Sequence, residues 1–421
     1  MKHTYKLTVL AASIGLFSSA PSVMAEDAFF EALTGGKVSF SARARYEGVE
    51  QDGKKDADAF TVRTTLGYTT GDFHGFKLSA EIEDISDLGQ DDYNDKVHSA
   101  HADRAVIADP ENTEINQAYL QYNGFDTEFK LGRQEITYRK APFHRFVGNV
   151  LWRQNHQSYD GLTVSNNSFE NTQISYAYIN KQNHILGDDK NDDVGFIKDG
   201  QIDMDTHLVN LQYSGLSFGK LEGYGYFIDY DDKPAASSQT IGARLSGGVP
   251  VSEDFKLIYT AEIANQNDYK DGTMDDQNYY LAEVGGKYKG WLAKVSYEMQ
   301  EGDGTDSFAT PFGTNHAFQG WGDMFLATPK EGLEDIYVTV VGNVLGAKVV
   351  AVYHDFETDK GSLDAGSEFD ILVQKTFKEH YTLGVKYADY NGDGEFNDAQ
   401  TIAKNKRVDT EKFWVYGQVK F

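Results

Sequence analysis

The sequence predicts an all-β fold: a transmembrane antiparallel β-barrel of about 18 strands with short periplasmic turns and long extracellular loops. Three observations predict it. Apolar and polar residues alternate with period two along the chain, the connections between alternating segments are short and long in turn, and all seven prolines fall outside those segments. Proline belongs outside because its missing N–H would break the ladder of a strand.

Each alternating segment carries apolar residues on one face and polar residues on the other. In 37–47, for example, Val38 and Phe40 alternate with Ser39 and Ser41. Most segments have about ten to twelve residues, which is the length that a tilted strand needs to cross a bilayer. The strands are predicted at 37–47, 60–71, 74–86, 113–123, 126–136, 157–166, 171–181, 204–214, 219–230, 238–248, 251–264, 278–288, 290–300, 333–343, 346–356, 367–377, 380–389 and 411–421.

The connections separate into two kinds. Long ones cover roughly 87–112, 137–156, 182–203, 301–332 and 390–410. If the N-terminus is periplasmic, every long connection lies outside and every short one inside, as in outer-membrane barrels. The alternative is a soluble β-sandwich or propeller, but a propeller needs a blade repeat of roughly 40 to 50 residues, and the sequence contains none.

The first 25 residues predict a secretory signal peptide. Lys2 and Lys6 give a basic start, an apolar stretch follows over 7–17, and Val23-Met24-Ala25 has the small-x-small form of a cleavage site. That stretch is too short to span a membrane as a helix. We therefore expect a signal peptide over 1–25 and an outer-membrane barrel domain over 26–421, in a Gram-negative cell.

Composition excludes several functions. The chain has 65 Asp and Glu against 39 Lys and Arg, and a net charge of −26 argues against a nucleic-acid partner. With no cysteine, disulfides and thiolate metal sites are absent. The segment 215–219 spells a nucleophile elbow, but strands are predicted on both sides where the motif needs a following helix. The sequence therefore predicts a protein that is not an enzyme.

One segment has the spacing of a calcium loop. Asp389, Asn391, Asp393 and Asn397 supply oxygen at positions 1, 3, 5 and 9, and glycine stands at position 6. Position 12 is Gln400 instead of glutamate. A structural Ca²⁺ in an outer loop and an acidic hairpin tip without metal are both compatible with this pattern, and no other cofactor is expected.

Charged residues at alternate strand positions are expected to face the lumen, since a charge facing lipid near the midplane costs about 2–4 kcal/mol. They are Arg43, Arg45, Arg63, Arg244 and Lys294, together with Glu81, Glu83, Glu262 and Glu298. Two interpretations remain open: facing charges that select solutes, or ion pairs that stiffen the wall, especially Arg63 beside Glu81. Arg133 shares the parity of Phe129 and Leu131, so a β-bulge at Gly132 is predicted to turn it inward.

Four motifs resemble the alginate export family of Gram-negative outer-membrane porins, most densely over 113–165. They are Leu131-Gly132-Arg133-Gln134-Glu135-Ile136, Arg145-Phe146-Val147-Gly148, Trp152-Arg153-Gln154 and Ser158-Tyr159-Asp160-Gly161. The resemblance implies an 18-stranded monomeric barrel with an arginine-rich constriction. It implies roles for Arg133 and Arg153, and Arg139 and Arg145 of the third outer loop could enter the lumen.

The last strand ends on Phe421, as outer-membrane barrels commonly do, which implies recognition by the barrel-assembly machinery. Outer-membrane lipid and lipopolysaccharide are the expected surroundings. The expected function is passive diffusion of hydrophilic, anionic solutes: alginate-like polysaccharide, uronates or small organic anions. The alternatives are a binding or adhesion barrel with a plugged lumen and, third, a barrel enzyme.

Overall fold

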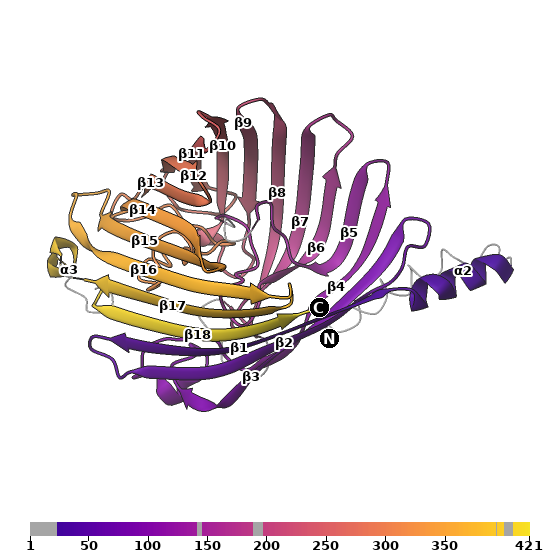
Figure 1. The fold of residues 1–421 in the computed structure, drawn as a ribbon, viewed down its shortest axis with the longest axis horizontal. Helices are drawn as coiled ribbons and strands as arrows, with labels where there is room; N and C mark the ends of the chain where they lie inside the picture. Colours follow the sequence, from indigo (N-terminus) through magenta and orange to yellow (C-terminus); the bar gives the residue numbers. More distant parts are fainter. Residues whose placement is uncertain (1–22, 141–144, 188–196, 393, 400–406) are drawn as a thin grey trace.

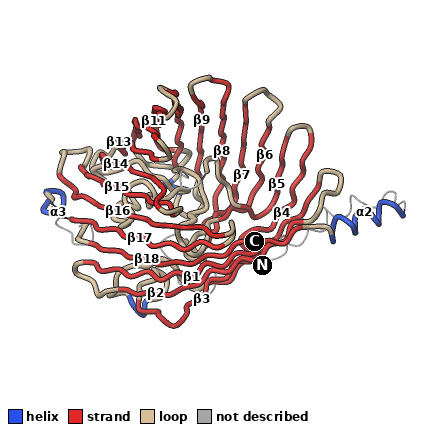
Figure 2. The backbone as a smooth tube through the Cα atoms, viewed as in Figure 1, coloured by secondary structure: helices blue, strands red, loops and turns tan. Residues whose placement is uncertain are grey.

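The strands form one antiparallel sheet of 18 strands that closes on itself, because β18 (Thr410–Lys420) pairs with β1 (Lys37–Gln51). The computed structural model describes residues 23–140, 145–187, 197–392, 394–399 and 407–421. Figure 1 shows the barrel and Figure 2 the loops that enter it. The other strands are β2 (Ala57–Thr69), β3 (Phe76–Asp92), β4 (Asn112–Gly124), β5 (Thr127–Gln134), β6 (Ser158–Asn166), β7 (Thr172–Asn183), β8 (Gln201–Leu216), β9 (Gly219–Ile228), β10 (Ser238–Pro250), β11 (Phe255–Asp268), β12 (Gln277–Tyr288), β13 (Trp291–Gln300), β14 (Leu333–Val344), β15 (Ala347–Glu357), β16 (Asp364–Phe377) and β17 (Tyr381–Asn391).

The structure confirms the predicted fold class, and each predicted strand coincides with an observed one. Some strands are longer than predicted: β3 continues to Asp92 and β8 begins at Gln201. The loops over 87–112 and 182–203 are correspondingly shorter. Outside the apolar band a strand can be polar on both faces, so the hydropathy pattern ends before the hydrogen-bonded ladder does.

The connections alternate in length as predicted. Several short ones are two-residue hairpin turns with positive φ at both central residues, as in Lys289-Gly290 (46° and 86°) and Leu345-Gly346 (52° and 75°). These angles define type I′ turns, whose twist matches that of the flanking strands and whose second position favours glycine. The long connections lie at the opposite end of the barrel, here called the long-loop end.

Helices are few and short. Among the described residues they are α2 (Val23–Thr34), α3 (Glu395–Ala399) and two single turns, η2 (Ser99–His101) and η3 (Pro234–Ala236). The helix α2 projects from the short-turn end (Figure 1), and its carbonyl at Ala32 accepts a hydrogen bond from Gly71 N–H at 2.8 Å. No described helix is long and apolar enough to cross a membrane. The predicted signal peptide lies mostly in residues 1–22, outside the described residues.

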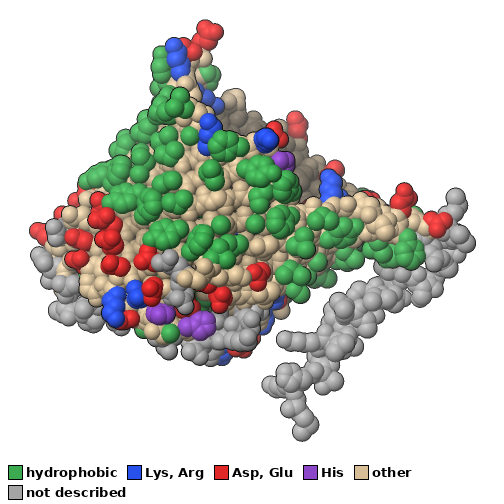
Figure 3. Space-filling model, turned by 60° about the horizontal axis from the view of Figure 1, so that its bottom comes forward, with side chains coloured by type: hydrophobic (Ala, Val, Ile, Leu, Met, Phe, Trp, Pro, Cys, Tyr) green, Lys and Arg blue, Asp and Glu red, His purple; other side chains and the backbone are tan. Residues whose placement is uncertain are grey.

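The outer face of the barrel is apolar. Figure 3 shows hydrophobic side chains in a broad band over the strands, with acidic side chains gathered beside it. Aromatic residues pair across strands on both sides of this band: Tyr353 with Phe369 toward the long-loop end, and Phe377 with Tyr381 beside the short turns. An apolar band between two aromatic girdles is the surface of a barrel that spans a membrane.

Candidate functional site

Two long loops fold into the lumen and meet there. They are loop 135–157 between β5 and β6, of which the structure describes 135–140 and 145–157, and loop 301–332 between β13 and β14. Gly148 N–H donates to the Phe312 carbonyl at 2.9 Å, and Arg145 Nη1 donates to Asn315 Oδ1 at 2.8 Å. Figure 2 shows loop segments, drawn in tan, inside the ring of strands. The structure thus bears out the expectation that the third outer loop enters the lumen.

The arginines of the first hairpin hold loop 135–157 against the wall. Arg43 donates from Nε to Gln154 Oε1 and from Nη1 to the Leu151 carbonyl, each at 3.0 Å, and from Nη2 to the Arg153 carbonyl at 2.5 Å. Arg45 Nη1 donates to the Trp152 carbonyl at 2.5 Å. Both guanidinium groups face inward, as predicted, but Arg43 is used by the loop, and Arg45 also pairs through Nη2 with the buried carboxylate of Asp109 between β3 and β4.

Arg63 also contacts loop 135–157, through His156. Its Nη1 hydrogen-bonds to His156, and its Nε lies 4.0 Å from Glu83 Oε2. The predicted pairing with Glu81 is wrong, because Glu81 lies opposite Gly67 in the β2–β3 register, four residues along the strand from Arg63. Glu81 Oε1 instead accepts hydrogen bonds from the amides of Asn116 and Gln117.

The arginines of loop 135–157 pair with carboxylates of the wall. Arg139 Nη2 lies 2.6 Å from Glu262 Oε1, and Arg145 Nη2 lies 2.7 Å from Glu298 Oε1. Arg153 Nη2 donates to Asp323 of loop 301–332 at 2.9 Å. These pairs are buried, and removal of one member of a buried pair typically costs about 3–5 kcal/mol. They join the loops to the wall or to each other. The predicted wall-stiffening role is filled by pairs between neighbouring strands, Arg244 with Glu262 and Lys294 with Glu283.

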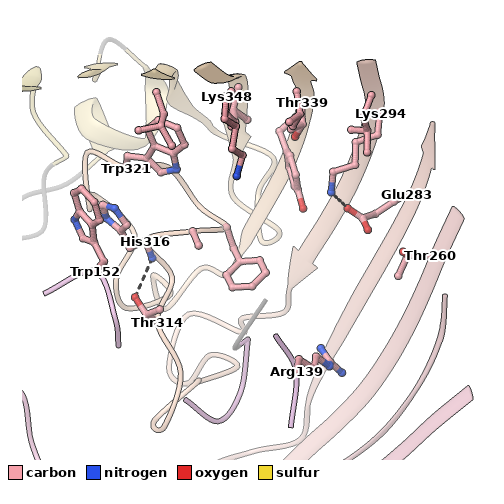
Figure 4. A pocket seen from close by; sticks show the side chains of 18 of the residues that line it. Arg139, Trp152, Thr260, Glu283, Lys294, Thr314, His316, Trp321, Thr339 and Lys348 are labelled. Atoms are coloured by element: carbon pink, nitrogen blue, oxygen red, sulfur yellow. Dashed lines mark hydrogen bonds and ion pairs between the residues drawn. The ribbon is translucent and has the colours of Figure 1, made fainter. Parts of the chain in front are cut away.

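A cavity of about 980 Å³ lies against these loops. Its lining contains eight basic residues and a single carboxylate, that of Glu283. The basic residues are Arg43, Arg45, Arg139, Arg244, Lys287, Lys294, Lys348 and Lys386. Figure 4 shows Lys348 of β15 and Lys294 of β13 on either side of Thr339 of β14, pointing into the same space as Trp321 and Arg139.

Two of these cations are available to a solute. Lys294 pairs with Glu283, and Arg244 Nη1 lies 2.6 Å from Glu262 Oε2. Lys287 and Lys348 have no hydrogen bond or ion pair within the described residues. An ammonium group that faces a cavity without a carboxylate partner favours an anion there.

The other predicted site residues do not line the cavity. Arg63, Arg145, Arg153 and Glu83 are buried in the loop–wall contacts behind it, and Glu81 is half-buried on the inward face. Five predicted residues do line it: Arg43, Arg45, Arg139, Arg244 and Lys294.

The prediction that Arg133 faces the lumen is wrong. The β4–β5 and β5–β6 registers run through Gly132 without a shift, so the predicted bulge is absent and Arg133 keeps the outward parity of Leu131. Its charge is met instead by Asp160 of β6, with Nε 2.7 Å from Oδ1. Arg133 is therefore not a pore-lining residue.

Sequence reasoning missed Lys287, Lys348 and Lys386. Each follows the parity rule that identified Arg43: Lys386, for example, alternates with the outward-facing Val385 and Tyr387. The signal was present at these positions. What the sequence did not show is which inward charges remain free after the loops fold in.

Burial and neighbouring charge shift the pKa of several loop groups. Burial and the charge of Lys386 lower the pKa of His316, so its Nε2 accepts a hydrogen bond from Lys386 at 2.5 Å. Burial opposes ionisation of Asp323, but the charge of Lys412 and the hydrogen bond from His316 hold its pKa well below the usual range. Asp323 of loop 301–332 thus stays ionised and pairs with Lys412 of β18 and with Arg153 of loop 135–157.

The predicted calcium ligands are only partly described, since Asp393 lies outside the described residues. Asp389 and Asn391 are exposed at the end of β17. The side-chain oxygen of Asn397 accepts a hydrogen bond from Arg407 N–H at 2.6 Å. No group of three or more His, Asp or Glu suited to a metal is found in the described part of the chain. Calcium binding stays a prediction.

No family model and no curated protein matches the chain. Solved structures resemble it over nearly their full length. OccAB2 of Acinetobacter baumannii has a TM-score of 0.72 and 15% identity, covering 93% of this chain and 99% of its own. Pseudomonas aeruginosa OpdK, solved with vanillate, has a TM-score of 0.70 and 12% identity, covering 92% and 99%.

A third structure is P. aeruginosa OccK2 (OpdF) in complex with glucuronate, with a TM-score of 0.68, 13% identity and coverage of 92% and 99%. At these identities the likeness shows the fold, which is the 18-stranded barrel of outer-membrane porins. The resemblance to the alginate export family rests on the quoted motifs alone.

Proposed function

We propose that this chain is an outer-membrane channel for passive diffusion of small anionic solutes in a Gram-negative cell. The observation that carries the proposal is the cavity lining, with eight basic residues against one carboxylate in a chain of net charge −26. Charges of one sign on low-dielectric walls focus the field inside a cleft and raise the local concentration of counter-ions. The sign of the charge that lines the cavity, and not the net charge of the chain, therefore decides which ions enter.

The chemistry of the cavity suits carboxylates. Lys287 and Lys348 offer ammonium groups, and Trp152, Trp321 and Tyr337 supply apolar surface to the same cavity. Weak contacts to several such groups let a solute enter and leave again. OpdK and OccK2 were solved with vanillate and glucuronate, which are both small carboxylates, and this supports the same solute class here.

Solute size follows from the inserted loops. A cavity of about 980 Å³ is at the upper end of the roughly 300–1,000 Å³ of small-molecule sites. Uronates and small organic anions fit this volume, so we favour them over the alginate-like polysaccharide suggested by the sequence motifs. Liposome swelling with glucuronate, a neutral hexose and alginate oligomers separates these possibilities: fast swelling with the oligomers would favour the polymer.

Planar-bilayer recordings in a salt gradient test the channel. Wild type should conduct with an anion-selective reversal potential, and Lys287→Gln/Lys348→Gln should shift that potential toward zero. Lys289→Gln/Lys378→Gln is the matched control, because it removes two exposed lysines from the short turns with the same change of net charge. Equal shifts in both double variants would contradict a role for the cavity lysines.

A plugged binding barrel is the second candidate, because the two inserted loops touch each other inside the lumen. It would fold and insert but give no conducting events. Under the channel proposal no catalytic step occurs. The monomeric state, the contacts with lipid and lipopolysaccharide, and recognition of Phe421 by the barrel-assembly machinery stay predictions.

A further inference from the structure

Lys386 has an unusual setting for a lysine that faces a water-accessible cavity. Its side chain is 4% exposed. The ammonium nitrogen lies 3.8 Å from the ring centroid of Trp152, 3.9 Å from that of Trp321 and 5.0 Å from that of Trp414. Three of the four tryptophans in the chain thus surround this one amine, and we call Lys386 with these three rings the lysine cage.

The rings of the cage come from separate parts of the fold. Trp152 belongs to loop 135–157, Trp321 to loop 301–332, and Trp414 to β18. Lys386 itself stands on β17. One ammonium group therefore touches both inserted loops and the wall, which no other cavity lysine does among the described residues.

A hydrogen-bonded chain reinforces the cage. His316 of loop 301–332 accepts from Lys386 at 2.5 Å and stacks on Trp152, with ring centroids 4.7 Å apart. Its other ring nitrogen pairs with Asp323 Oδ1 at 2.6 Å. Asp323 in turn binds Lys412 of β18 at 2.8 Å. This chain runs from β17 through the loop and back to the wall.

The backbone of loop 301–332 is clamped beside the cage. Gly322 N–H donates to Glu368 Oε1 at 2.6 Å, and Trp321 N–H donates to Asp370 Oδ2 at 3.3 Å. Gly320 has φ +85°, and a Cβ there would lie 2.4 Å from Glu368 Oε2. The two glycines let the loop approach β16 closely enough to hold the Trp321 ring over Lys386.

No carboxylate oxygen forms an ion pair with Lys386 within the described residues. At contact distance its charge is met by ring faces and by His316, while the carboxylates of Asp370, Asp323 and Glu368 act on it from beyond ion-pair distance. The ring of an indole is the strongest aromatic partner of a cation. If either loop moved away, the amine would lose partners that the wall alone does not replace. Loop position and the solvation of Lys386 are therefore coupled.

We propose that Lys386 is a positioning residue that fixes the two inserted loops to the β17–β18 wall and so sets the width of the constriction, while the other cavity lysines meet the solute. The conductance readout of this inference rests on the proposed channel function. The fluorescence readout does not, because it reports the cage itself.

The test compares Lys386→Met with Lys348→Met, which removes a charge from the same cavity outside the cage. Both are made in a Trp291→Phe background, because Trp291 lies on the outer face and the remaining three tryptophans then report only the cage. Heat-modifiable migration on gels confirms a folded barrel. Lys386→Met should give larger, fluctuating single-channel currents. It should also give red-shifted tryptophan fluorescence that acrylamide quenches more strongly than in wild type.

Lys348→Met should lower anion preference and leave current noise and emission at wild-type values. Lys386→Arg should restore much of the wild-type behaviour, since a guanidinium also stacks on indole. If Lys386→Met does not fold, Trp321→Leu opens the cage from the loop side and should give the same noise and the same increase in quenching.

Two results would overturn the inference. In one, Lys386→Met lowers anion preference as Lys348→Met does, with steady currents and unchanged emission, and Lys386 is then a solute contact. In the other, Lys386→Met changes neither current nor emission. If wild type itself does not conduct, the channel function fails, while emission and quenching still decide whether the cage holds the loops.

Discussion

Arg139 forms a two-pronged ion pair with Glu262: Nη2 to Oε1 is 2.6 Å and Nη1 to Oε2 is 3.3 Å. The pair joins loop 135–157 to β11, and Glu262 also accepts from Arg244 of β10 at 2.6 Å. One carboxylate thus fixes a loop arginine and a wall arginine together. This relationship explains why inward acidic residues are abundant although the cavity lining is basic.

Glu262→Gln should therefore destabilise the protein and loosen the loop. A broken buried pair costs about 3 kcal/mol or more, and urea unfolding in lipid vesicles measures the loss. Glu128→Gln is the control, because its pair with Lys130 is partly exposed and should cost at most about 1 kcal/mol. Equal losses in the two variants would contradict the anchoring role of Glu262.

Arg43→Ala is expected to widen the channel more than it changes its selectivity. The guanidinium of Arg43 donates to the backbone carbonyls of Leu151 and Arg153, so its removal frees loop 135–157. Single-channel conductance should rise, with a smaller shift of reversal potential than in Lys287→Gln/Lys348→Gln. A large selectivity shift at unchanged conductance would mean that Arg43 meets the solute directly.

Glu135 should make the loop contacts acid-sensitive. Burial opposes its ionisation, but His156 and the amides of Asn116 and Asn149 lower its pKa from 4.5 to about 2. Because the folded pKa is depressed, the stabilisation is present above the unfolded value and is lost as pH falls from about 4.5 toward 2. The loss amounts to about 3 kcal/mol.

Midpoints of urea unfolding, measured from pH 6 to pH 2.5, test this predicted loss of stability. The midpoint of wild type should fall steeply below pH 4.5, while Glu135→Gln should start lower and fall less. Parallel curves for the two proteins would show that Glu135 is not the group responsible.

Arg133→Gln should leave anion preference unchanged, because Arg133 faces outward and pairs with Asp160. The reversal potential in a salt gradient is the measurement. A shift like that of the cavity lysine variants would restore Arg133 to the lumen and contradict the observed register.

Period-two alternation predicted the barrel well because a membrane-spanning strand must place apolar residues on one face over its whole crossing. Parity also placed Arg43, Arg244 and Lys294 inward correctly. At Arg133 the sequence pattern led to the prediction of a bulge, but the alternation continues through this residue. The carboxylate of Asp160 on β6 meets the charge of Arg133 on the outer face, so no bulge is needed.

The site itself was less predictable. Arg43 bonds residues about 110 positions away, from Leu151 to Gln154, and nothing in a strand pattern tells where a long loop will fold. The same is true of Lys386, whose rings come from Trp152, Trp321 and Trp414. Alternation gives the direction of a side chain, whereas its partner depends on the path of the loops.

The reversal potential of purified wild-type protein in a planar bilayer under a salt gradient tests the channel proposal most directly. An anion-selective potential is expected, because Lys287 and Lys348 face the cavity without carboxylate partners among the described residues. A cation-selective potential, or no conducting events from folded protein, would contradict it.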